Sequence, residues 1–172
     1  MTLFFTGDHH FSHFNILRYT GRPFATVIEM DRIMVERWNE RVKSRDSVMH
    51  LGDISFGRYP QIAHNVGKLN GQIWIIKGNH DKAKDLDQLV KDKLIDGWER
   101  EKKEWTAPDG SVWYLAHHPL PGEHRQLCGH VHQHWAIQGW KVNCGVDAWQ
   151  FRPITIEEIQ EKIREEHASW MS

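Results

Sequence analysis

The sequence predicts an α/β protein with a second sheet stacked on the first, and two observations lead to this fold class. In the first half, short apolar runs alternate with segments of helical periodicity, which is typical of β-α-β units. In the second half, short apolar runs separated by turn residues predict a mostly β region. The length of 172 residues suits one domain covering residues 1–172.

The first half has three predicted strands and three predicted helices. The strands are the apolar runs at 3–7, 47–52 and 72–78. The first helix begins at Thr26, which forms a capping box with Glu29 ahead of Met34 and Trp38 at helical spacing. The second begins at Pro60, a residue suited to a first helical turn, and runs to about Leu69. The third covers residues 85–94.

The second half is predicted as strands followed by one helix. "WEREKKEW" (98–105), "APDG" (107–110) and "SVWYLA" (111–116) are typical of strand, turn and strand. "QLCG" (126–129) and "WAIQGWKVNCG" (135–145) add further strands. A second capping box, Thr155 with Glu158, begins a C-terminal helix with Ile156, Ile159 and Ile163 on one face.

Composition excludes several classes of protein. The net charge of −1 argues against a strongly basic nucleic-acid surface. The apolar stretch at the N-terminus is too short for a signal peptide or a membrane span, so we expect a cytoplasmic protein without a membrane partner. Cys128 and Cys144 are expected to be buried thiols rather than a disulfide. The 13 histidines are the unusual feature, because histidine is the commonest metal ligand.

Polar residues that bind metals or titrate follow five of the predicted strands. The clusters are Asp8 to His10; Asp53; Asn79, His80 and Asp81; His117 and His118; and His130 with His132. Ligands in open α/β sheets bind outside the carboxyl ends of the strands. These side chains are therefore expected to converge at one edge.

The residue types predict a metal centre. Carboxylates and imidazoles without thiolates suit Mn, Fe or Zn, rather than a cysteine-rich structural zinc site. Asp8 and His10 are two residues apart, as are His130 and His132, so each pair is expected on one face of an extended segment. Seven candidate ligands are too many for one open site and suit two metals that share a carboxylate.

Five motifs together resemble the calcineurin-like metallophosphoesterases. They are "GDHHFSH" (7–13), "GD" (52–53), "GNHD" (78–81), "HHP" (117–119) and "GHVH" (129–132). The resemblance runs from Gly7 to about Asp147 and is strongest to compact single-domain members from bacteria and phages. It implies a β-sandwich of two mixed sheets flanked by α-helices.

The resemblance also implies a role for each residue. It implies one metal on Asp8, His10 and His132, a second on Asn79, His117 and His130, and Asp53 bridging them. A hydroxide bridging the metals would attack phosphorus in line. His80 would contact the phosphate and stabilise or protonate the leaving oxygen. Asp81 would accept a hydrogen bond from His80, and the catalytic residues would be His80, Asp81 and Asp53.

The function predicted on this basis is hydrolysis of phosphate esters, with a nucleotide phosphodiester favoured. The cofactors are two divalent ions, with Mn favoured and Fe, Zn, Ni or Co as alternatives. The partner is the ester substrate, including a nucleotide or a nucleic-acid end, and a homo-oligomer is left open. The alternatives are a phosphomonoesterase or protein phosphatase, and an inactive scaffold of the same fold.

Several further residues have two interpretations. His13 and Asn15 would either touch substrate or stabilise their loop. Arg18, Arg22 and Arg58 are expected at the solvated surface, although they could reach a phosphate. His50, Trp74 and Trp113 are expected in the core. Gly78 is expected to supply backbone freedom in its turn.

Overall fold

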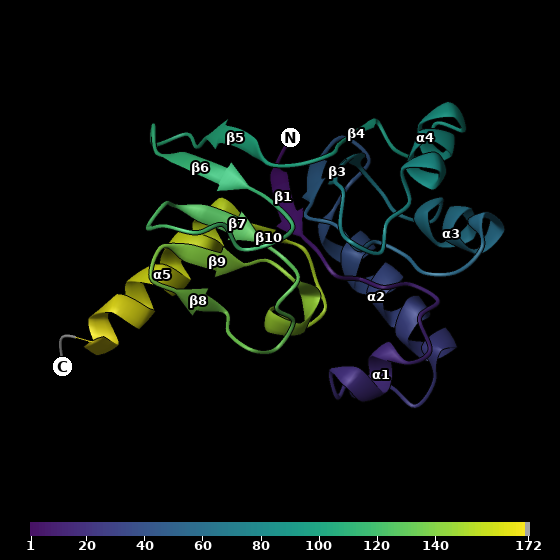
Figure 1. Ribbon diagram of the computed structural model, residues 1–172, viewed down its shortest axis with the longest axis horizontal. Coiled ribbons are helices and arrows are strands. Elements are labelled where there is room, and N and C mark those ends of the chain that lie inside the picture. The colour runs from purple at the N-terminus through teal and green to yellow at the C-terminus, as the bar shows by residue number, and fades with distance from the viewer. Residues whose placement is uncertain (171–172) are drawn as a thin grey trace.

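A computed structural model describes the backbone of residues 1–170 and the side chains of residues 1–166. Its central sheet has the strand order β10-β1-β2-β3-β4 (Figure 1). The strands are β1 (Leu3–Thr6), β2 (Ser47–His50), β3 (Gln72–Ile76), β4 (Gly97–Glu99) and β10 (Ile154–Thr155). The first four are parallel, and β10 is antiparallel to β1. The three strands predicted in the first half are confirmed, although each ends one or two residues earlier.

The helices follow the predicted order. They are α1 (Ile16–Tyr19), α2 (Val27–Arg41), α3 (Tyr59–Val66), α4 (Ala83–Lys91) and α5 (Ile156–Trp170). At α2 the Thr26 hydroxyl accepts a hydrogen bond from the Glu29 N–H at 3.1 Å, but the Glu29 carboxylate accepts from the Ala25 N–H rather than from the Thr26 N–H. At α5 the Thr155 N–H donates to Glu158 Oε2 at 2.9 Å. The capping box of α5 is confirmed and that of α2 forms in part, whereas the single turn of α1 is not predicted from the sequence.

The second sheet has the order β5-β6-β7-β9-β8. Its strands are β5 (Lys103–Thr106), β6 (Val112–Leu115), β7 (Gln126–Cys128), β8 (Ile137–Gln138) and β9 (Lys141–Asn143). The prediction of one strand over 98–105 is wrong, because Glu99 ends β4 in the central sheet and Lys103 begins β5 in the second. The three residues between them are charged and exposed. They make the crossing between sheets rather than a strand.

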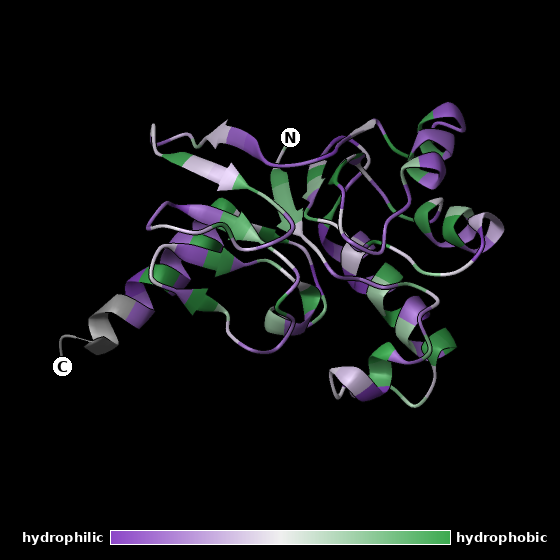
Figure 2. Ribbon diagram, in the orientation of Figure 1, coloured by the Kyte–Doolittle hydropathy of each residue, from purple (hydrophilic) through white to green (hydrophobic). Residues whose placement is uncertain are grey.

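Alternate residues of the central strands enter two different cores. Phe4 packs with side chains of α2, α3 and α4, whereas Phe5 packs with strands of the second sheet and with α5. Val48 and Met49 divide in the same way. Successive side chains of a strand point to opposite faces, so the central sheet is covered on both sides. Figure 2 shows the apolar residues along β1 and hydrophilic residues over much of α4.

Several predictions for single residues can now be compared with the structure. Trp113 and His50 are buried as expected. Trp74 is wrongly predicted as core: it is 39 % exposed, and its ring covers Gly97. The thiols of residues 128 and 144 are free and buried, as expected. In the described part of the chain, no helix is both long and apolar enough to cross a membrane.

Candidate metal centre

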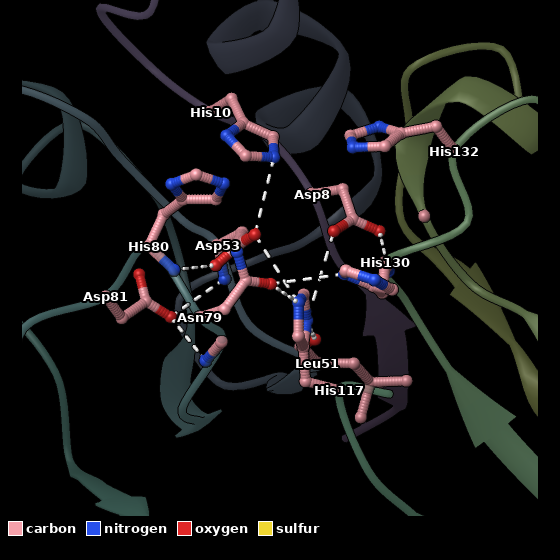
Figure 3. A network of polar contacts seen from close by, with 12 residues as sticks. Asp8, His10, Leu51, Asp53, Asn79, His80, Asp81, His117, His130 and His132 are labelled. Atoms are coloured by element: carbon pink, nitrogen blue, oxygen red, sulfur yellow. Dashed lines mark hydrogen bonds and ion pairs between the residues drawn. The ribbon is translucent and has the colours of Figure 1, made fainter. Parts of the chain in front are cut away.

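The five polar clusters predicted from the sequence meet where the two sheets adjoin (Figure 3). Backbone hydrogen bonds join the loops: the Asp8 N–H donates to Gly52 O at 2.9 Å, and the His10 N–H donates to Asp53 O at 3.0 Å. The His130 N–H donates to Asp8 Oδ2 at 2.8 Å, which links the two sheets. The structure therefore brings together all seven predicted ligands.

One group of donor atoms comes from Asp8, His10 and His132. One ligand atom of each lies within 4.8 Å of the others. Asp8 Oδ1 and both ring nitrogens of His10 are buried and have no hydrogen-bond partner among the described residues. Buried polar atoms rarely stay unpaired, because desolvation is costly. Unpaired oxygen and nitrogen atoms facing one point are the arrangement that a divalent cation requires, so this group fits a metal.

The second group comes from Asn79, His117 and His130. Asn79 Oδ1 lies 2.8 Å from His117 Nε2 and 3.1 Å from His130 Nδ1. His117 Nδ1 donates to the carbonyl of Leu51 at 2.8 Å, which fixes the ring with Nε2 toward the centre. An amide oxygen and two imidazoles on one point are suitable ligands for a borderline divalent ion.

Asp53 lies between the two groups. Its Oδ2 is 3.6 Å from His10 Nε2 and 3.4 Å from His117 Nε2, while its Oδ1 accepts a hydrogen bond from the His80 N–H. Burial raises the pKa of Asp53, but His117 and His10 outweigh burial and hold the pKa below its usual range. An ionised oxygen that faces both groups lies where a ligand shared by two metal ions would have to lie.

Two of these groups have raised pKa values. Burial is the largest influence on Asp8 and raises its pKa to about 7, against the opposing charges of His117 and His132. Burial lowers the pKa of His117, but Asp53 and Asp8 outweigh burial and raise it to about 8. The protonated ring of His117 thus supplies a positive charge beside the carboxyl groups of Asp8 and Asp53.

His118 is the alternative to His117 as a ligand. His117 is 3 % exposed and faces Asp53, as described above. His118 is exposed, and its ring centroid lies 4.2 Å from that of His130. A donor atom of His118 can also join those of His117 and His130 within 4.8 Å. The structure therefore places both histidines near the second group, with His117 at its centre.

The backbone at the predicted ligands is left-handed. Positive φ angles occur at Asp8 (55°), His10 (51°), Asp53 (56°), His130 (71°) and His132 (47°). The prediction that each pair lies on one face of an extended segment is therefore wrong. Such angles are uncommon outside glycine and collect at functional sites. They turn neighbouring side chains toward the same centre.

Gly78 and Gly129 are required by close packing against the carboxylates. A Cβ on Gly78 would overlap Asp53 Oδ1, and a Cβ on Gly129 would lie 2.7 Å from Asp8 Oδ2. Gly78 does not have a positive φ, so the expectation that it supplies backbone freedom is wrong. Gly78 and Gly129 instead leave room for a carboxylate of another loop.

Asp81 holds the backbone around Asp53 in place. The prediction that it accepts a hydrogen bond from His80 is wrong. Its carboxylate accepts hydrogen bonds from the N–H groups of Gly78 and Asp53 at 2.8 Å and of Ile54 at 3.1 Å. His80 is exposed, and its ring centroid lies 5.4 Å from that of His10. Asp81 therefore positions the loop that carries Asp53, and the ring of His80 faces the open side of the centre.

Two residues that support His132 are not predicted from the sequence. Arg22, expected at the surface, is 5 % exposed, and its Nε donates to Asp147 Oδ1 at 2.8 Å. A second guanidinium nitrogen donates to the carbonyl of Asp8 at 2.6 Å. Asp147 Oδ2 lies 2.8 Å from His132 Nδ1. Asp147 follows β9 just as the other clusters follow their strands, and that position is the signal that could have found it.

Comparisons with known proteins give relatives without an assigned function. No protein-family model matches the chain. The chain is 39% identical over 82 residues to the uncharacterized protein MJ1445 of Methanocaldococcus jannaschii, covering 46% of this chain and 47% of that protein. The chain thus spans about half the length of this relative. A solved structure, the protein of unknown function AQ665 from Aquifex aeolicus, has a TM-score of 0.73 at 22% identity over 92% of this chain and 97% of the other. That likeness shows the fold alone.

Proposed function

We propose that this protein is a calcineurin-like metallophosphoesterase, with the β-sandwich of that class, and that it hydrolyses phosphodiesters of nucleotides or related compounds. The observation that carries the proposal is the position of Asp53. Its Oδ2 lies 3.4 Å from His117 Nε2 and 3.6 Å from His10 Nε2. A single carboxylate oxygen between two groups of donors is the arrangement of a dinuclear centre.

Each group of donors would hold one divalent ion, the first on Asp8, His10 and His132 and the second on Asn79, His117 and His130. Oxygen and imidazole donors without thiolate suit Mn, Fe, Zn, Ni or Co, and manganese is the ion proposed. Two ions so held supply Lewis-acid stabilisation of phosphoryl oxygens and activation of water at neutral pH. Asp53 would be shared by both, and Asp81 keeps the Asp53 backbone in position through its hydrogen bonds.

His80 acts on the ester rather than on a metal. Its backbone N–H donates to Asp53 Oδ1 at 2.8 Å, which fixes the residue beside the centre. Its ring lies at the exposed side, where an ester approaches. There it hydrogen-bonds the phosphate and protonates the leaving oxygen, a role to which histidine is suited near neutral pH.

A phosphodiester is favoured over a monoester because the centre is open. Asn79, His80 and His130 are exposed, so a substituent on either side of the phosphorus can extend into solvent. A dianionic monoester gains most from an enclosed pocket of cationic side chains. The exposed side chains at the centre include the imidazoles of His80 and His130, and the buried Arg22 is directed at Asp147.

The test is metal analysis combined with two nitrophenyl esters. Protein loaded with Mn²⁺ should bind two ions and hydrolyse bis(p-nitrophenyl) phosphate faster than p-nitrophenyl phosphate. Asp53→Asn removes the shared charge and should lose most activity and at least one ion. Asp109→Asn, in the exposed β5–β6 turn, is the control. Full activity of Asp53→Asn, or activity unaffected by a chelator, would refute the proposal.

A further inference from the structure

Phe56 is an exposed aromatic residue that the loop after β2 holds firmly beside His80. It is 42 % exposed, so its own burial explains little of its presence. Its backbone N–H donates to Phe11 O at 2.7 Å, and the adjacent Ser55 hydroxyl donates to the same carbonyl at 3.1 Å. These bonds tie the Phe56 loop to the segment that carries His10. An exposed ring in a fixed position can serve as a binding surface.

The rings of His13, Phe56 and His80 form one aromatic cluster at the side of the metal centre. The His13 and Phe56 rings are stacked, with centroids 4.3 Å apart and an interplanar angle of 21°. The Phe56 and His80 centroids lie 5.9 Å apart at 67°. Tyr19, which is largely exposed, approaches His13 at 6.2 Å. The cluster is continuous with the donor groups, because the His10 and His13 rings are 5.5 Å apart.

A small cavity opens beside this cluster. Its volume is about 140 Å³, and Phe56 and His80 line it together with apolar side chains of α3 and α4. Lys82 and Asp85 also line it and offer one hydrogen-bond donor and one acceptor group. Whole-ligand pockets are usually about 300–1,000 Å³, so this cavity admits one ring system rather than a complete ligand.

We infer that Phe56 and the cavity beside His80 bind a nucleobase in the ester group that leaves the phosphorus. The inference rests on the proposed function, because His80 is the residue that meets the leaving oxygen. A nucleobase matches the surface in two ways. Its flat face stacks on an aromatic ring, and the polar atoms at its edge pair with Lys82 and Asp85, which a plain hydrocarbon cannot do.

Adenosine, which carries no phosphate, tests the surface separately from hydrolysis. We expect adenosine to bind Mn²⁺-free protein, detected by saturation-transfer NMR and by contacts between adenine and Phe56 ring protons. Phe56→Leu should weaken adenosine binding at least fivefold, because loss of base stacking is usually that costly. Phe56→Trp should keep the affinity, since it keeps an aromatic face. Trp74→Leu is the control, a comparably exposed ring on β3 outside the cavity.

Each outcome has a clear meaning. If adenosine fails to bind the wild type at millimolar concentration, or binds Phe56→Leu as tightly as the wild type, the inference is wrong. Hydrolysis of bis(p-nitrophenyl) phosphate by the same wild-type sample would then show that the proposed function still stands. If adenosine binds as expected and no ester is hydrolysed, the proposed function fails and the base-binding surface remains. Circular dichroism confirms that each variant is folded.

Discussion

His132 Nδ1 donates a hydrogen bond to Asp147 Oδ2 at 2.8 Å. Burial raises the pKa of Asp147, but hydrogen bonds from His132 and Arg22 outweigh burial and lower the pKa to about 2. The carboxylate is therefore ionised and can only accept, so Nδ1 of His132 carries the hydrogen and Nε2 is the ring nitrogen left for the metal group. Carboxylates in this position orient a ligating histidine and raise its basicity.

Loss of the Asp147 charge should weaken one metal site. Asp147→Asn keeps the shape but leaves the Arg22 guanidinium uncompensated and the His132 ring less firmly oriented. Affinity for one Mn²⁺ should fall by about 10- to 100-fold, the usual effect of such partners, while the second ion binds as before. Isothermal titration calorimetry measures both. Asp109→Asn serves as the control, and unchanged affinities in Asp147→Asn would contradict the assigned role.

Removal of the His80 ring should separate catalysis from metal binding. His80→Ala should lower kcat by about 10²- to 10⁴-fold, the usual contribution of a general acid. Both metal ions should remain by elemental analysis, because the His80 ring is not a ligand. His64→Ala, at an exposed position of α3, is the matched control. A fully active His80→Ala protein would show that His80 does not have this role.

Metal loading should release protons at mildly acidic pH. The metal-free centre holds Asp8 at a pKa of about 7 and His117 at about 8, so both are protonated at pH 6. A cation needs the deprotonated forms, so binding should release about two protons at pH 6. Affinity should begin to decrease as pH falls below about 8, and more steeply below about 7. Calorimetry in two buffers of different ionisation enthalpy measures the release. A binding heat independent of buffer would disprove it.

A methyl group at residue 78 should disrupt the centre by contact alone. Gly78→Ala would place its Cβ against Asp53 Oδ1 and 2.7 Å from Asp53 Cγ. We expect reduced metal stoichiometry and a loss of about 1–3 kcal/mol in the free energy of unfolding, which is typical of overpacking. Gly7→Ala is the matched control, since its nearest neighbour would be at an ordinary 3.5 Å. Two ions at native affinity in Gly78→Ala would contradict the steric explanation.

The composition of the centre could be predicted from the sequence, but its geometry could not. Strand ends and residue types were enough to bring Asp8 and Asp53 together, because the parallel strands β1 and β2 deliver their ends to one edge of the central sheet. His117 follows β6 of the second sheet, and a rule for a single sheet does not predict that it joins them. The support of the centre depends on contacts that are distant in sequence, as between Arg22 and Asp147, 125 residues apart. A single sequence carries no signal for such pairs.

Some predictions for single residues were wrong because tertiary packing overrode the local sequence pattern. Trp74 lies in an apolar run, yet its face of β3 is only partly covered, and the ring remains 39 % exposed. Residues 100–102 lie inside a segment that was predicted as one strand. They are charged and exposed, and they link β4 of the central sheet to β5 of the second sheet. The role of Asp81 was misjudged because backbone N–H groups from other loops compete for its oxygens.

Left-handed backbone torsions orient the candidate ligands for metal binding but lower the folding stability of the chain. They occur at Asp8, His10, Asp53, His130 and His132. Each such residue costs on the order of 1–3 kcal/mol that glycine would recover. Substitution of a ligand by glycine would therefore remove a metal donor and relax the chain in the same step. At Asp8 and Asp53 this relaxation would be opposed by the loss of the hydrogen bonds that their carboxylates accept from the N–H groups of His130 and His80.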